Sequence, residues 1–70
     1  MYINSAIILE PEKGESINTF IESILSYKKV YNIHFGNTNL IAKFNDVFFE
    51  ITADMNDYNS ILQSWESVWY

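Results

Sequence analysis

The sequence has no cysteine, and it holds only one histidine, one proline and two glycines among its 70 residues. Without cysteine there are no disulfide bonds, and one imidazole cannot supply the four ligands of a structural zinc site. The glycines, Gly14 and Gly36, stand alone, so there is no glycine-rich phosphate loop. We therefore predict no cofactor and no metal site.

Long hydrophobic runs are also missing. The longest apolar run extends from Ala6 to Leu9, far below the roughly 18 residues that a membrane span requires. The first residues, Met1 to Asn4, lack the positive charge that opens a signal peptide. Together with the absence of cysteine, these features predict a soluble protein of the cytoplasm that does not enter membranes.

Basic residues are scarce and unevenly placed. The formal net charge is −5, and the charges balance over residues 1–43, which hold all four lysines and four glutamates. Residues 44–70 hold no base and five acids: Asp46, Glu50, Asp54, Asp57 and Glu66. Only Lys28 and Lys29 approach the clustered cations that phosphate binding needs, so we expect no nucleic-acid partner. The acidic end suits a basic protein partner or an ordinary solubilising surface.

Aromatic residues, in contrast, are abundant: five Phe, five Tyr and two Trp. A chain of 70 residues forms at most one domain, here residues 1–70, and buries only about 60% of the surface of its unfolded chain. Domains of this size depend on disulfides, metals or partner chains. With the first two excluded, dense aromatic packing or self-association remains.

Hydrophobic periodicity predicts the elements of the first half. Residues 2–9 alternate as in a strand, and Pro11 and Gly14 then interrupt the pattern. Residues 15–28 carry apolar side chains at helical spacing: Ile17, Phe20, Ile21, Ile24 and Leu25. Residues 30–35 alternate again, which predicts a second strand.

A β-hairpin is the clearest local pattern. The two-residue loop Asn45-Asp46 joins residues 40–44 to residues 47–51. This loop length fixes three cross-strand pairs: Phe44 with Val47, Ala42 with Phe49, and Leu40 with Ile51. All six side chains then share one face, so register and hydrophobicity agree.

The last element is predicted to be a helix over residues 58–69. Its apolar stripe consists of Tyr58, Ile61, Leu62, Trp65, Val68 and Trp69, and Asp54, Asn56 or Asp57 can cap its N-terminus. The full order is β-α-β-β-β-α. We predict an α+β two-layer sandwich in which a four-stranded, mostly antiparallel sheet carries both helices on one face.

The sheet face without helices is the first candidate site. A solvent-facing sheet face is normally polar, whereas this one is predicted to carry Ile8 among several apolar residues. We predict a partner-binding surface on this face. Its apolar centre consists of Tyr2, Ile41 and Phe48, and its polar rim consists of Lys43, Asp46 and Glu50. Isolated exposed hydrophobic residues, or a helix over this face, are the alternative explanations.

The aromatic pair Trp69-Tyr70 is the second candidate. Trp69 falls on the apolar stripe of the last helix, which favours a core position. Tyr70 lies off that stripe, and tyrosine is enriched at interface hot spots. We therefore add Tyr70 to the predicted partner-binding residues.

Catalytic patterns are weak. Glu10, Glu12 and Glu15 form a cluster of carboxylates before the first helix, but a Pro/Gly turn leaves them in solvent. His34 has no nucleophile and orienting acid spaced around it. The segment that starts at Asp54 lacks the Gly and Glu that a calcium loop needs at its sixth and twelfth positions. We predict that the protein is not an enzyme.

The predicted order of the last five elements, α-β-β-β-α, resembles that of double-stranded RNA-binding domains. Those domains read RNA with a basic helix end, whereas the last helix here has Glu66 and neither Lys nor Arg, so the resemblance is one of topology. Ferredoxin-like regulatory modules of the ACT type also carry helices on one side of a sheet, but they end on a strand.

These features together predict a small acidic protein-binding module. Its most concrete form is a regulator or inhibitor of the antitoxin, immunity or phage-accessory kind, which occupies a surface on another protein. The alternative is a homodimeric ligand-sensing or structural module, in which two open sheet faces stack and a small molecule sits at the seam.

Overall fold

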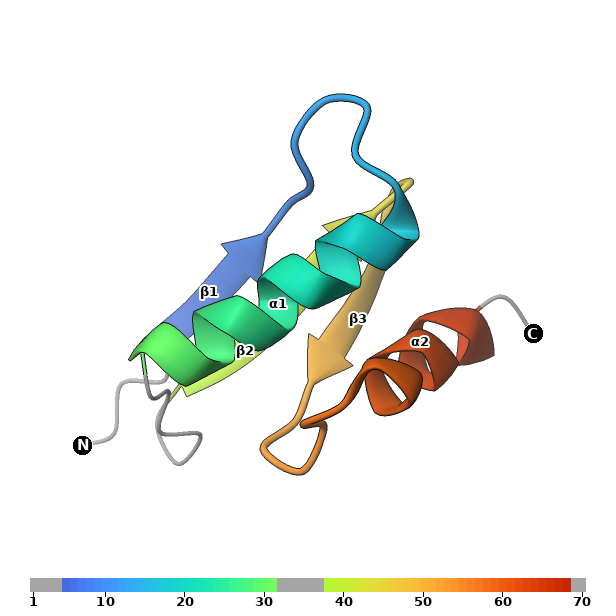
Figure 1. Ribbon diagram of the computed structural model, residues 1–70. Helices are drawn as coiled ribbons and strands as arrows, with labels where there is room; N and C mark the ends of the chain where they lie inside the picture. Colours follow the sequence, from blue (N-terminus) through green and yellow to red (C-terminus); the bar gives the residue numbers. More distant parts are fainter. Residues whose placement is uncertain (1–4, 32–37, 69–70) are drawn as a thin grey trace.

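The computed structural model describes residues 5–31 and 38–68 of the chain. The elements follow in the order β-α-β-β-α (Figure 1): β1 (Ser5–Leu9), α1 (Ile17–Tyr31), β2 (Thr38–Phe44), β3 (Val47–Ile51) and α2 (Tyr58–Ser67). The α+β content of the prediction is confirmed. Within these ranges the sheet has three strands, so the prediction of four is wrong.

The first two residues of the predicted second strand belong to α1. Val30 and Tyr31, which the sequence pattern assigns to a strand, form the end of this helix. Tyr27 and Tyr31 are one turn apart, and their ring centroids lie 4.6 Å from each other, a contact that favours continuation of the helix. Alternation over so few residues fits a helix equally well. The rest of the predicted strand, residues 32–35, lies outside the described ranges.

β2 is the central strand and has one parallel and one antiparallel neighbour. β1 runs parallel to β2, with Ile7 opposite Leu40 and Ile8 opposite Ile41, and β3 runs antiparallel to β2. The sheet is therefore mixed, and the prediction of a mostly antiparallel sheet needs correction. The reason is the crossover through α1, which carries the chain back along the sheet before β2 begins.

The hairpin between β2 and β3 is confirmed in all three predicted pairs: Phe44 with Val47, Ala42 with Phe49, and Leu40 with Ile51. Its turn residues both have positive φ, 51° at Asn45 and 63° at Asp46. Two consecutive left-handed residues fit a type I′ turn, whose twist matches that of the strands. Asn and Asp tolerate this backbone region better than other residues with a side chain.

We expect Asp46→Ile to destabilise the protein by about 1–2 kcal/mol, because a β-branched side chain is strained at positive φ. Asp46→Gly is the matched control, since glycine adopts this conformation freely. Its free energy of unfolding should lie within about 0.5 kcal/mol of that of the wild type. Urea denaturation measures both values. Equal effects of the two substitutions would contradict a left-handed conformation at Asp46.

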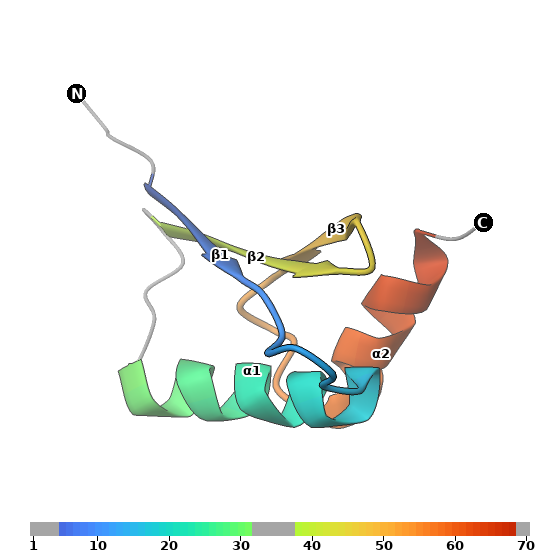
Figure 2. The same cartoon turned by 90° about the horizontal axis from the view of Figure 1, so that it is seen from above.

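Both helices pack on the same side of the sheet (Figure 2). The buried side chains form one cluster between these layers: Phe20, Ile21, Ile24, Leu40, Ala42, Phe44, Phe49, Ile51 and Ile61. Phe44 joins the two helices to the hairpin, because its ring stacks on Phe20 and meets Trp65 edge-on, each at 5.8 Å between centroids. The predicted one-sided placement of the helices is therefore correct.

Side-chain caps define the helix N-termini. The Oγ of Ser16 accepts a hydrogen bond from the Thr19 N–H (3.2 Å) at the start of α1, and Asp57 Oδ1 accepts one from the Ser60 N–H (2.8 Å) at the start of α2. Of the three predicted caps of the last helix, Asp57 is the one used. Neither described helix is long and apolar enough to cross a membrane.

Candidate functional site

The open sheet face is the side of the sheet that points away from α1 and α2 (Figure 2). Its residues alternate along the strands with those that enter the core, because successive side chains of a strand point to opposite faces. The described residues of this face are Ala6, Ile8, Asn39, Ile41, Lys43, Phe48 and Glu50.

Large apolar side chains lie exposed on the two outer strands of the open sheet face. Phe48 is 56% exposed and Ile8 is 53% exposed. Ile41, on the central strand, is half-buried and lies directly opposite Ile8. Phe48 is a diagonal neighbour of Ile41 across β2 and β3, because Ile41 pairs with Glu50 and Lys43 pairs with Phe48. The three apolar side chains therefore form one continuous patch.

Two charged side chains border this patch. Lys43 Nζ lies 5.5 Å from the centre of the Phe48 ring, within the range of a cation–π interaction. Glu50 is exposed and lies opposite Ile41. Each of these two neighbouring cross-strand pairs, Ile41 with Glu50 and Lys43 with Phe48, therefore joins one apolar residue to one charged residue.

The structure brings together four of the predicted partner-binding residues: Ile41, Lys43, Phe48 and Glu50. Asp46 is exposed in the hairpin turn, nearer to Lys43 and Phe48 than to Ile41 and Glu50. Tyr2 and Tyr70 lie outside the described residues. Ile8 is the addition: its alternation already places it on this face, but only the parallel pairing of β1 with β2 puts it beside Ile41.

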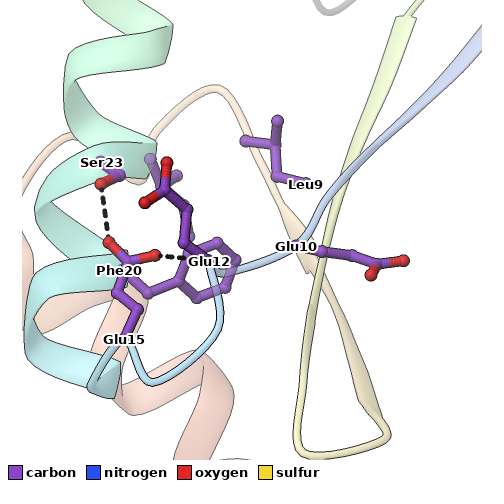
Figure 3. Close-up of a pocket in the computed structure, with 7 residues that line it drawn as sticks. Leu9, Glu10, Glu12, Glu15, Phe20 and Ser23 are labelled. Carbon is purple, nitrogen blue, oxygen red and sulfur yellow. Dashed lines mark hydrogen bonds between the residues drawn. The ribbon is translucent and has the colours of Figure 1, made fainter.

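The glutamates before α1 line a small hollow, shown in Figure 3, with a volume of about 170 Å³. Glu15 binds both the Glu12 N–H (3.0 Å) and the Ser23 hydroxyl (3.2 Å), while Glu10 points away from this pair. The Glu15 carboxylate therefore ties the loop to the helix. Among the described residues, no three His, Cys, Asp or Glu side chains are placed to hold a metal ion.

A second hollow, of about 240 Å³, lies at the ends of β2 and β3. It is lined by Asn39, Leu40, Glu50, Ile51, Thr52 and Ala53. Pockets for small molecules usually have volumes of about 300–1,000 Å³. Both hollows are below this range, so neither favours a small-molecule ligand.

Lys28 stabilises the packing of the loop before α2 on the end of α1. Its ammonium group donates hydrogen bonds to the carbonyl oxygens of Thr52 (3.2 Å) and Met55, which fastens the loop before α2 to the end of α1. Partial burial lowers the pKa of Lys28, and the negative charge of Asp54 opposes that shift. Lys28 is thus turned toward this loop.

The acids near the start of α2 likewise have local roles. Asp57 caps the helix, and the Thr52 hydroxyl donates to Asp54. Hydrogen bonds lower the pKa of both carboxyl groups: that of Asp54 mainly through Thr52, and that of Asp57 mainly through the Ser60 N–H. These contacts show that both acids stabilise the start of α2 and the loop before it.

The same hydrogen bonds predict a loss of stability in acid. Because the folded-state pKa values of Asp54 and Asp57 lie below the ordinary value of 3.8, their contribution is present above that pH and is lost as the pH falls through the folded values. Asp57→Asn keeps a capping oxygen but cannot titrate, so its Tm should fall less steeply than that of the wild type below about pH 4. Thermal unfolding followed by circular dichroism tests this, and parallel profiles would contradict it.

Comparisons with protein families, with curated proteins and with solved structures gave no match to this chain.

Proposed function

We propose that this chain is a protein-binding module that acts by docking its open sheet face on another protein, as a small regulator or inhibitor does. The observation that carries this proposal is the exposure of Phe48, 56%, beside Ile8 and Ile41 on a sheet face that no described element covers. A continuous apolar patch of this kind is typical of contact surfaces between proteins.

The fold does not need Phe48 for its own core. Its neighbour Phe49 is buried at 3% exposure and supplies the aromatic side chain that packs under the helices. Burial of a phenylalanine side chain contributes about 1.5–3 kcal/mol. In Phe48 much of this free energy is still available for association with a partner.

The test is a capture experiment in an extract of the source cells, read by mass spectrometry. Immobilised wild type is expected to retain a protein that Phe48→Glu retains at least tenfold less, because the substitution replaces the apolar ring with a carboxylate that must lose its hydration in the contact. Val30→Glu is the matched control: Val30 is also exposed (71%) but lies on α1, so this variant should capture as the wild type does.

Two results would overturn the proposal. One is equal capture by the wild type and Phe48→Glu. The other is unfolding of Phe48→Glu, seen as loss of its circular dichroism signal, which would assign Phe48 to the core.

A further inference from the structure

The charges on the open sheet face form a pattern that is complementary to itself. Ile41 pairs with Glu50, and Lys43 pairs with Phe48, so these four residues occupy the corners of one block on β2 and β3. The charged residues lie on one diagonal of the block, and the apolar residues lie on the other. We call this group the charge block.

Two copies of the charge block match when they are stacked face to face about a two-fold axis. If the axis runs along the diagonal from Ile41 to Phe48, it brings Lys43 of each copy to about 2.7 Å from the position directly over Glu50 of the other copy, because the block is longer than it is wide. Each Lys43 then faces Glu50 of the other copy, and each apolar residue faces its own counterpart. This is the reciprocal pattern that an isologous interface requires.

The geometry of this stack is an ordinary one for sheets. Neighbouring strands lie about 4.8 Å apart and two residues span about 6.7 Å, so the diagonal makes an angle of roughly 35° with the strands. A two-fold axis along it makes the strands of the two copies cross at roughly 70°. Orthogonally packed sheets have crossing angles of this order.

Among the surfaces through which two copies can associate, charge favours the open sheet face. The chain carries a formal charge of −5, so two copies repel each other over most of their surface. On the described strands of the open sheet face, Lys43 and Glu50 are the ionisable residues and cancel, while Asp46 lies outside the strands in the turn. Stacking through this face therefore brings no net charge into contact.

We infer that the protein docked on the open sheet face is a second copy of this chain, held by reciprocal Lys43–Glu50 pairs around Ile41 and Phe48. The inference rests on the proposed function, because it uses the same surface and names its partner. The sheet face measures about 14 by 17 Å, an area of about 240 Å². Each partner of a standard interface contributes roughly 800 Å², so this area is small. The dimer is therefore weak and reversible.

Self-association through this surface regulates access to it. A second copy and a different protein would occupy the same open sheet face. The dimer must therefore dissociate before Phe48 contacts a different protein. Dimerisation thus competes with every other partner of the open sheet face.

Sedimentation velocity over a concentration series tests the inference. The wild type should dimerise reversibly. Lys43→Glu and Glu50→Lys should each weaken dimerisation at least tenfold, because each turns two attractive pairs into two repulsive ones. An equimolar mixture of these two variants should recover a dissociation constant within about threefold of the wild type, since every cross-copy pair is again opposite in sign.

Three further variants complete the experiment. The double variant Lys43→Glu with Glu50→Lys restores both pairs within one chain type and should dimerise as the wild type does. Lys13→Glu and Glu22→Lys make the same charge changes at exposed positions away from the sheet and should leave dimerisation unchanged.

A wild type that stays monomeric up to about 1 mM would overturn the inference. So would a dimer that is insensitive to the charge reversals, because it would use another surface. A monomeric wild type that still captures a different protein in a Phe48-dependent manner would refute the dimer alone and leave the proposed function standing.

Discussion

Phe49→Ala is expected to lower the free energy of unfolding by about 3–5 kcal/mol, the typical cost of deleting a buried phenylalanine side chain. Phe49 is 3% exposed, and its cross-strand partner is Ala42, a side chain too small to fill the space. At about 0.05–0.15 kcal/mol per residue, a chain of 70 residues has a total stability of only about 3.5–10 kcal/mol. Urea denaturation at 25 °C should therefore show a strongly shifted midpoint or a largely unfolded protein.

Phe48→Ala is the matched control for this prediction. It removes the same atoms from the neighbouring position on the same strand, but from a side chain that is 56% exposed. Its cost should stay within about 1 kcal/mol. If the two variants were equally unstable, the assignment of the two faces of β3 would be wrong.

Ile61→Ala is expected to cost about 2–5 kcal/mol and to release α2 from the sheet. Ile61 is 0% exposed and is the residue of α2 that enters the buried cluster. α2 has ten residues, and an isolated helix of that length is unstable in water. Without this anchor, α2 is held only by its partly buried side chains, Tyr58, Leu62 and Trp65.

Hydrogen exchange locates this effect. Amide protons of α2 should exchange much faster in Ile61→Ala than in the wild type, with a smaller change in β2. Gln63→Ala, at an exposed position of the same helix, should change the free energy of unfolding by less than about 0.5 kcal/mol. Unchanged protection of α2 in Ile61→Ala would show that other contacts hold the helix.

Phe48 and Phe49 are adjacent on β3, and we expect one to serve association and the other to serve stability. One face of β3 is committed to the core through Phe49, and the other presents Phe48 to a partner. A domain this small buries a limited fraction of its surface, and an apolar side chain left outside the core adds little to stability until a partner covers it. We therefore expect association and stability to be separable by mutation at these two positions.

The hairpin shows how much of the fold could be predicted from local sequence. A two-residue loop sets the register, and the alternation of side chains then assigns each residue to a face. The positions of Ile41, Lys43, Phe48 and Glu50 on one face follow directly, and the observed pairs agree. This part of the candidate site could be predicted from the sequence, because the turn, the register and the alternation all depend on residues close in the chain.

Residues 30–35 show where local sequence was insufficient. Their alternation fits a strand, yet Val30 and Tyr31 belong to α1. The contact between the rings of Tyr27 and Tyr31 favours the helix, and a period-2 pattern does not report such a contact. The predicted site residues Tyr2 and Tyr70 lie outside the described ranges and remain predictions.

The sequence by itself determined the α+β class, the two faces of the hairpin and the absence of disulfide and thiolate chemistry, since each depends on composition or on neighbouring residues. The tertiary structure alone decided that β1 lies parallel to β2, which places Ile8 beside Ile41 and completes the apolar patch. Residues about thirty positions apart meet there because α1 packs across the sheet and returns the chain. That pairing depends on the packing of the whole chain, and no local period encodes it.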